Sequence, residues 1–185
     1  EALRAGNMES SYLQGISVSR IARDREGGYW IGTQQHGLFY CPDWNSGTQA
    51  QSPFLQGENV MAVVAGENRL YAGLGNGRIF EMEPAKQQIT DISPPGVSFV
   101  AGLFYHHPTS TLGVAGTSLH FYRRGQWQIP KAGLPNHTAT IFGGANFLSP
   151  ASQPGQWLVA SFAALSRLDA RQGILLDCSN CVGDT

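Results

Sequence analysis

The sequence is short of charged residues, of cysteines and of long hydrophobic runs, and each shortage argues against a class of protein. Charged residues make up 14% of the 185-residue chain, well below the quarter that is usual. The 12 basic and 13 acidic residues are dispersed, whereas a phosphate backbone needs a concentrated positive face. We therefore expect no nucleic-acid partner. No run of 18 apolar residues occurs, so the sequence predicts no membrane-spanning helix.

The three cysteines are too few and too irregularly spaced for a disulfide scaffold. Cys178 and Cys181 form a single C-x-x-C motif, but no second pair is present to complete a four-ligand zinc site. A thioredoxin-like role would place this motif at a helix start in a βαβ unit, and the sequence gives no sign of one. Two interpretations stay open, a short disulfide in an oxidising compartment or two unrelated thiols.

Motifs of catalysis are also missing. The sequence holds no Gly-x-Ser-x-Gly, no His-Glu-x-x-His and no phosphate-binding loop. His106 and His107 are adjacent, and adjacent side chains of an extended segment point to opposite sides, so the two do not easily share a metal. We therefore expect no catalytic residues, no metal site and no cofactor, and we expect that the protein is not an enzyme.

What the sequence has in abundance is glycine, with 23 residues, beside a normal hydrophobic fraction of 42%. The clearest stretch contains three short apolar runs, Val18–Ala22, Tyr29–Gly32 and Leu38–Tyr40, separated by polar turns at Asp24–Gly28 and Gln34–Gly37. Tight reversals need Asp and Gly, and pleated strands favour β-branched and aromatic residues. This stretch therefore predicts a three-stranded antiparallel meander.

The meander recurs along the chain. In each copy a small residue closes the second apolar run, and these anchors are Gly32, Gly73, Gly116 and Ser161, which lie 41, 43 and 45 residues apart. The predicted first strands are Ile16–Ala22, Val60–Ala65, Ser98–Tyr105 and Thr138–Phe147, and the predicted fourth strands are Thr48–Leu55, Gln88–Ile92, Gln126–Ile129 and Gly173–Leu176. A small anchor lets neighbouring sheets approach closely. Trp30 and Trp157, both just before an anchor, are then expected in the core between sheets.

Four short strands in a unit of just over 40 residues are typical of a β-propeller blade. The predicted fold is therefore all-β, a β-propeller segment of four blades with about four antiparallel strands each. The blades are expected at about 13–56, 57–96, 97–135 and 136–178, with a tail at 179–185. Because closure removes exposed strand edges, we favour part of a larger propeller, or pairing with another chain through open edges, over a closed four-bladed ring.

One copy resembles a known family. Residues Ile21 to Thr33, followed by Gly37 and Leu38, resemble the two-component regulator propeller repeat, and they depart from it mainly at Gly28, where Asn is usual. The resemblance implies a sensor region of a bacterial histidine kinase or hybrid two-component system. It also implies a location on the periplasmic or extracellular side of the inner membrane, with a kinase module downstream in the full-length protein.

Loops between the second and third strands of each blade share one face with the connections to the next blade, and loops on rigid scaffolds commonly bind ligands. The candidate ligand-binding residues on this face are Gln34, Gln35, His36, Asn76, Asn136 and His137. Amide and imidazole groups suit a carbohydrate or another small polar ligand, although turn chemistry alone also explains these residues. We expect a non-enzymatic ligand sensor; the alternatives are a protein-interaction scaffold and a propeller polysaccharide hydrolase or lyase.

Overall fold

A computed structural model of the chain describes residues 13–43, 51–83, 86, 88–117, 119–128, 147–150, 156–160, 165–169 and 174–177. The regular elements in these residues are β-strands, together with short 3-10 turns such as η2 (His107–Thr109). The all-β prediction is therefore confirmed.

The strands form four antiparallel sheets of four strands each, in which chain neighbours are also sheet neighbours. The first two sheets comprise β1 (Val18–Arg23), β2 (Tyr29–Thr33), β3 (Leu38–Cys41) and β4 (Gln51–Phe54), then β5 (Val60–Ala65), β6 (Leu70–Leu74), β7 (Ile79–Glu83) and β8 (Gln88–Asp91). The last two comprise β9 (Val100–His106), β10 (Thr111–Gly116), β11 (His120–Arg123) and β12 (Gln126–Gln128), then β13 (Phe147–Pro150), β14 (Gln156–Ala160), β15 (Leu165–Asp169) and β16 (Ile174–Asp177).

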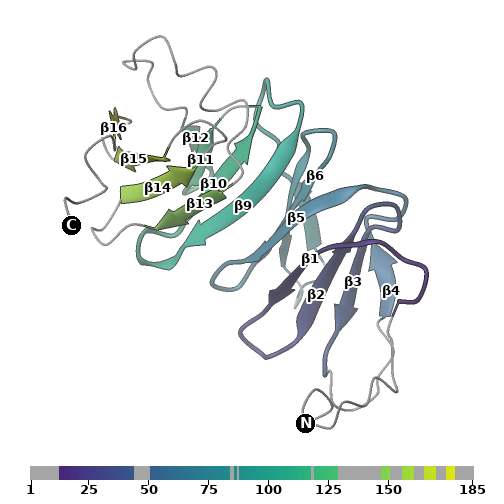
Figure 1. Cartoon of the computed structure of the whole chain (residues 1–185). Helices are drawn as coiled ribbons and strands as arrows, with labels where there is room; N and C mark the ends of the chain where they lie inside the picture. The colour runs from purple at the N-terminus through teal and green to yellow at the C-terminus, as the bar shows by residue number, and fades with distance from the viewer. Residues whose placement is uncertain are drawn as a thin grey trace, which may run out of the picture.

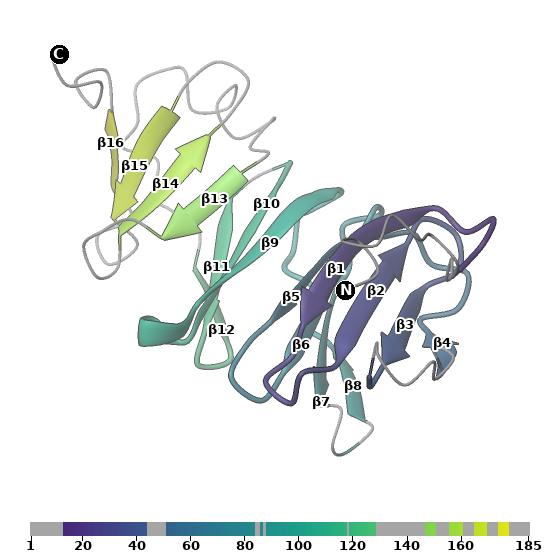
Figure 2. The same ribbon diagram turned by 60° about the horizontal axis from the view of Figure 1, so that its bottom comes forward.

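The sheets follow one another in chain order (Figures 1 and 2), and the first strand of each sheet contacts the first strand of the next, from β1 to β5, β9 and β13. The later strands of each sheet run outward from this row. A row of small sheets whose first strands lie side by side is the arrangement of propeller blades.

A shared bulge gives the register of the repeat. In each of the first three sheets the pairing of the first two strands skips one residue, at Ser19, Met61 and Ala101. Aligned on the bulge, Gly32 and Gly73 are equivalent, but their counterpart in the third sheet is Ala115 and not Gly116. The predicted third anchor was therefore wrong by one residue, because Ala115 and Gly116 are both small and spacing alone could not separate them.

The anchors are small because the next sheet comes close. A Cβ added to Gly32 would lie 2.9 Å from Cγ1 of Val60, and one added to Gly73 would lie 2.6 Å from Cγ1 of Val100. At Gly116 the added atom would instead overlap the Phe99 carbonyl oxygen, which belongs to the same sheet's own first segment. Ser161, the predicted fourth anchor, lies outside the described residues.

The core lies between sheets, as the tryptophans show. Trp30 is 2% exposed and packs in a cluster with residues of the second sheet, the one that follows it. Trp157 is fully buried but packs against His106 and Phe121 of the third sheet, the one that precedes it, with ring centroids 5.3 and 5.7 Å apart. Both are inter-sheet core as predicted, yet they face opposite neighbours and do not occupy the same position.

In the fourth sheet only one end of the predicted first strand can be compared with the structure. The prediction ran from Thr138 to Phe147, whereas β13 runs from Phe147 to Pro150; residues 138–146 lie outside the described residues. Ser149, predicted in a turn, is therefore in a strand. Pro150 is compatible with a strand because β13 lies at the edge of its sheet, and an edge strand tolerates a missing N–H group.

Candidate functional site

The site begins with the turn between β1 and β2. The Asp24 N–H donates to the Gly28 carbonyl at 2.9 Å, and Oδ1 of Asp24 accepts the Gly28 N–H at 2.7 Å. The other carboxylate oxygen, Oδ2, accepts the indole N–H of Trp30 at 3.0 Å. One acidic side chain thus closes the turn and orients the tryptophan.

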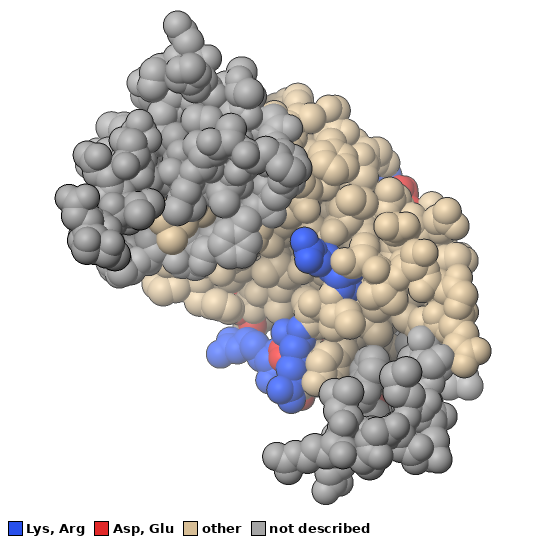
Figure 3. All heavy atoms as spheres, viewed as in Figure 1, with Lys and Arg blue, Asp and Glu red and all other residues tan. Residues whose placement is uncertain are grey.

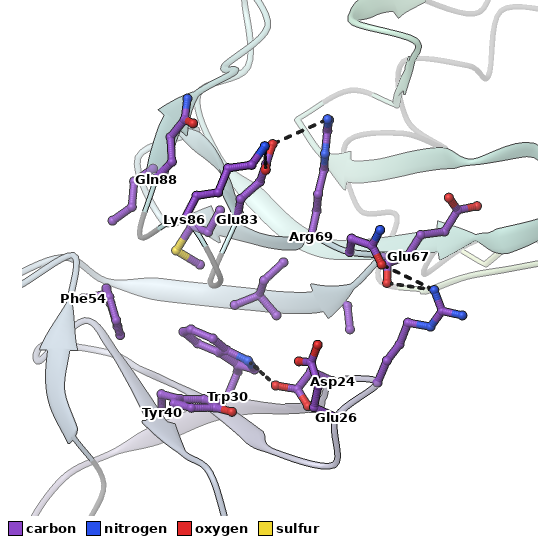
Figure 4. A pocket seen from close by; sticks show the side chains of 17 residues that line it. Asp24, Glu26, Trp30, Tyr40, Phe54, Glu67, Arg69, Glu83, Lys86 and Gln88 are labelled. Carbon is purple, nitrogen blue, oxygen red and sulfur yellow. Dashed lines mark hydrogen bonds and ion pairs between the residues drawn. The ribbon is translucent and has the colours of Figure 1, made fainter.

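A pocket of about 740 Å³ opens beside this turn, between the first and second sheets. One wall is aromatic and belongs to the first sheet (Figure 4), where the Trp30 ring lies 4.5 Å from the Tyr40 ring and 5.6 Å from the Phe54 ring, centroid to centroid. This volume lies within the usual range for a small-molecule site, and aromatic side chains commonly line such sites.

The opposite wall belongs to the second sheet and is charged (Figure 4). Glu83 binds Lys86 at 2.6 Å and Arg69 at 3.7 Å, and Arg69 also binds Glu81 at 2.8 Å. The hydrogen bond from Lys86 is the leading cause that lowers the pKa of Glu83; desolvation opposes it, and the charges of Lys86 and Arg69 add to it. The cations of this wall are therefore matched by carboxylates.

Tyr40 adds a protonated phenol to the pocket. Burial, and then the negative charges of Asp24 and Glu26, raise the pKa of its phenol above the ordinary value. The hydroxyl therefore stays protonated at neutral pH, and it hydrogen-bonds to Asp24. Carboxylate oxygens and a phenol oxygen that accept hydrogen bonds, beside an apolar ring surface, together suit a ligand with many hydroxyl groups.

Arg25 bridges the two sheets at the rim of the pocket. Its guanidinium donates to the Glu67 carbonyl at 3.3 Å and to Oδ1 of Asn68 at 3.5 Å, across the junction from β1–β2 to β5–β6. Glu67 is in turn bound by the third sheet, because the Ser110 hydroxyl donates to Oε1 of Glu67 at 2.7 Å. The Glu67 turn is therefore held by both neighbouring sheets.

The sequence-predicted loop residues lie at the other end of the strands. Gln34, Gln35, His36 and Asn76 are exposed, and none of them lines the pocket between the first two sheets. Their loops do share one face, because Glu58 accepts the Gly37 N–H through its carbonyl at 3.2 Å and pairs with Arg78 through its carboxylate at 3.4 Å.

Local roles account for part of this loop face. The Asn76 side chain accepts the Arg78 N–H at 3.2 Å, and the His36 N–H donates to Oγ1 of Thr33 at 3.0 Å. Both are interactions that stabilise turns. Asn136 and His137 lie outside the described residues, as do Cys178 and Cys181, so these parts of the sequence-based predictions stay predictions.

Sequence reasoning missed the pocket residues Tyr40, Arg69, Glu83 and Lys86. The Asp24–Gly28 turn was recognised, but only as an element of the fold. The alternation of side chains along each strand could have indicated which residues face a neighbouring blade. Whether those side chains leave a pocket depends on the residues of both blades, which the repeat does not specify. No cluster of three or more His, Cys, Asp or Glu side chains suited to a metal is found among the described residues.

Comparison with known proteins identifies the fold and no family. No family model and no curated protein matches the sequence. Among the solved structures that match is a chain of the nidogen/laminin complex, with a TM-score of 0.68 and 14% identity over 89% of this chain and 64% of that one. The extracellular domain of the hybrid two-component system BT4673 from B. thetaiotaomicron matches with a TM-score of 0.58 and 14% identity over 91% of this chain and 28% of that one. PorZ, a surface component of the type-IX secretion system of Porphyromonas gingivalis, matches with a TM-score of 0.61 and 13% identity over 94% of this chain and 22% of that one.

This chain spans less than two thirds of the length of each of these proteins. Two of them are extracellular or surface bacterial domains. No helix in the described part of the chain is long and apolar enough to cross a membrane. With four-stranded antiparallel sheets in a row, and with these neighbours, the chain has the β-propeller fold.

Proposed function

We propose that the chain is a non-catalytic, ligand-sensing segment of a β-propeller in a bacterial two-component signalling protein, on the periplasmic or extracellular side of the inner membrane. The observation that carries the proposal is the pocket of about 740 Å³ between the first two sheets. The fold shared with the extracellular domain of BT4673 supports the signalling context. The resemblance of residues 21–38 to the regulator repeat supports it as well.

The pocket favours an uncharged polyhydroxyl ligand such as a short oligosaccharide. Arg69 and Lys86 are already neutralised by Glu81 and Glu83, so the wall offers no unmatched charge to attract an ion. Hydrogen bonds to hydroxyl groups and contact with the Tyr40 and Phe54 rings are the interactions that remain. Aromatic walls with a few polar groups are typical of such sites.

A ligand in the pocket between the first two sheets would change how these two blades pack against each other. The pocket has one wall on each sheet, so a ligand that contacts both adds its binding energy to the docked arrangement. The Arg25 bridge to Glu67 and Asn68 is exposed and weak alone. The two sheets can therefore shift relative to each other at the end that carries the β1–β2 and β5–β6 turns, which we call the hairpin end. In the full-length protein this change would pass to the downstream kinase module.

The first sheet also supports a segment of a larger assembly. Ile21, in the first strand of the first sheet, is 56% exposed. In a longer propeller a preceding blade would cover this side chain, and in a paired assembly a second chain would.

The first test is a thermal-shift screen of the chain against neutral oligosaccharides. A ligand at a hundred times its dissociation constant adds about 2.7 kcal/mol to the free energy of unfolding. We expect Glu26→Gln, which removes the charge and replaces one acceptor oxygen at the pocket by an NH2 donor without touching the core, to reduce the shift. Gln35→Ala, at the opposite end of the strands, should leave it unchanged.

The pair of variants also separates the two candidate faces. If Gln35→Ala abolishes the shift and Glu26→Gln does not, the ligand binds the loop face predicted from the sequence, and the pocket is not the site. If no oligosaccharide stabilises the protein while a protein partner is captured tightly, the scaffold alternative gains. The match to a chain of the nidogen/laminin complex is the observation that keeps that alternative open.

A further inference from the structure

A second pocket lies at the next junction, between the second and third sheets, at the same end of the strands. It encloses about 300 Å³, and its lining includes Glu67, Arg69, Tyr71, Tyr105, Tyr122 and Arg124. It shares the Glu67–Arg69 turn with the first pocket, and it places three tyrosines from the strands β6, β9 and β11 around one space. Equivalent positions of two successive blade junctions therefore each contain a pocket.

The shared register shows how the second pocket differs from the first. Aligned on the bulges, Tyr71 takes the position of Trp30, so an aromatic ring forms the wall of each pocket. Tyr105 stands where the second sheet has Ala65, and Tyr122 where it has Met82. Larger and more polar side chains thus fill part of the second hollow, which explains its smaller volume.

The carboxylates around the second pocket are already engaged. Glu67 accepts the Ser110 hydroxyl at 2.7 Å, and Glu81, behind the wall, accepts Arg69 at 2.8 Å. Tyr71 also makes a hydrogen bond to Glu81. Arg69 is therefore neutralised, and the acceptors that the pocket could offer to a ligand are largely used.

One donor group at the rim has no such partner. Arg124 makes no hydrogen bond or ion pair with the rest of the described chain. It stands with Gly125 in the two-residue turn between β11 and β12, with φ angles of 51° and 77°. Two successive left-handed residues fit a type I′ hairpin turn, so the position of the arginine at the rim is defined by the backbone.

The walls beside Arg124 are flat and aromatic. Tyr71 and Tyr105 stack with ring centroids 5.7 Å apart and planes 19° apart. Burial is the leading cause that raises the pKa of Tyr71, Tyr105 and Tyr122, so all three stay neutral at physiological pH. The pocket combines the unpaired guanidinium of Arg124 with neutral aromatic surface, and the Glu67 carboxylate, which accepts the Ser110 hydroxyl, also lines it.

We propose that the pocket between the second and third sheets binds a small carboxylate with a planar body, whose anionic group docks on the Arg124 guanidinium and whose flat part contacts the tyrosines. A guanidinium presents paired N–H donors that match a carboxylate. This site is independent of the polyhydroxyl ligand proposed for the first pocket, although both sites share the Glu67–Arg69 turn.

The test uses benzoate as the probe and two-dimensional ¹H–¹⁵N NMR as the measurement. We expect benzoate to move the amide signals of Asn68, Tyr105 and Gly125 along saturable curves. Benzyl alcohol, which has the same ring and no charge, should bind about tenfold more weakly, and Arg124→Gln should weaken benzoate by about tenfold. Arg20→Gln, an exposed arginine on β1, serves as the matched control and should change nothing.

Several results would overturn the proposal. Benzoate affinity that is equal in Arg124→Gln and wild type, or benzyl alcohol that binds as tightly as benzoate, removes the arginine from recognition. An acidic peptide that binds at these residues when benzoate does not would mean a protein partner instead. A well-dispersed spectrum of Arg124→Gln would show that the variant is folded, and its oligosaccharide response should be intact, so failure here and failure of the first pocket are distinguishable.

Discussion

Trp30→Ala is expected to lower the free energy of unfolding by about 3–5 kcal/mol, the range typical of a large aromatic residue removed from a core. Trp30 is 2% exposed and packs between the first two sheets. Its ring also contacts Tyr40 and Phe54. Removing it would leave a cavity that a rigid pair of sheets fills poorly. Chemical denaturation followed by circular dichroism measures the change.

Trp30→Phe separates the ring from its hydrogen bond. Phenylalanine keeps most of the apolar volume but cannot donate to Oδ2 of Asp24, so the expected loss is smaller, about 1–2 kcal/mol. If Trp30→Ala costs less than this variant, the ring is not part of the inter-sheet core, and the aromatic wall of the first pocket would also be in doubt.

The strand repeat was predictable from sequence because it rests on local chemistry. The polar Asp24–Gly28 turn and the short apolar runs beside it form β1 and β2 as expected. β5 was predicted to the residue, since Val60–Ala65 is a continuous apolar run bounded by polar residues. In the fourth sheet the turn after the first strand was placed too early, because Ser149 was assigned to that turn and lies in β13.

The pockets were not predictable in the same way. A pocket between blades depends on pairs of residues from different blades, such as Phe54 facing Lys86, and no spacing rule relates them. Ala65 and Tyr105 occupy equivalent positions of the second and third sheets, and the larger side chain reduces the volume of the second pocket without changing the pattern of strands. The sequence prediction instead followed loop polarity to Gln34 and its neighbours, where polar residues are abundant but the described pockets do not lie.

The two ends of the blades differ in how the sheets meet. At the loop end, the Gly37 N–H of the first sheet donates to the Glu58 carbonyl, in the segment that leads into the second sheet, at 3.2 Å. Backbone there lies directly against backbone. At the hairpin end, side chains such as Arg25 span the junction instead, which leaves room for ligands. A sensor built this way keeps one end of each junction fixed and adjusts at the other.

Gly77→Ala tests this fixed end and is expected to destabilise the protein by about 3 kcal/mol. Gly77 lies in the turn between β6 and β7 with a φ of 88°, where a residue with a Cβ costs about 1–2 kcal/mol. The added atom would also overlap the carbonyl oxygen of Val97, in the segment that leads into the third sheet. Overpacking against backbone adds about 1–3 kcal/mol, because backbone cannot turn aside as a side chain can.

Gly96→Ala is the matched control, and the difference between the two variants isolates the contact between sheets. Gly96 has a similar φ of 81°, but nothing lies within 4 Å of the added Cβ, so the expected loss is only the conformational part, about 1–2 kcal/mol. Urea denaturation midpoints of both variants give the comparison. Equal losses would mean that the Val97 segment yields freely, and the loop end of the junction would then be as adjustable as the end that holds the pockets.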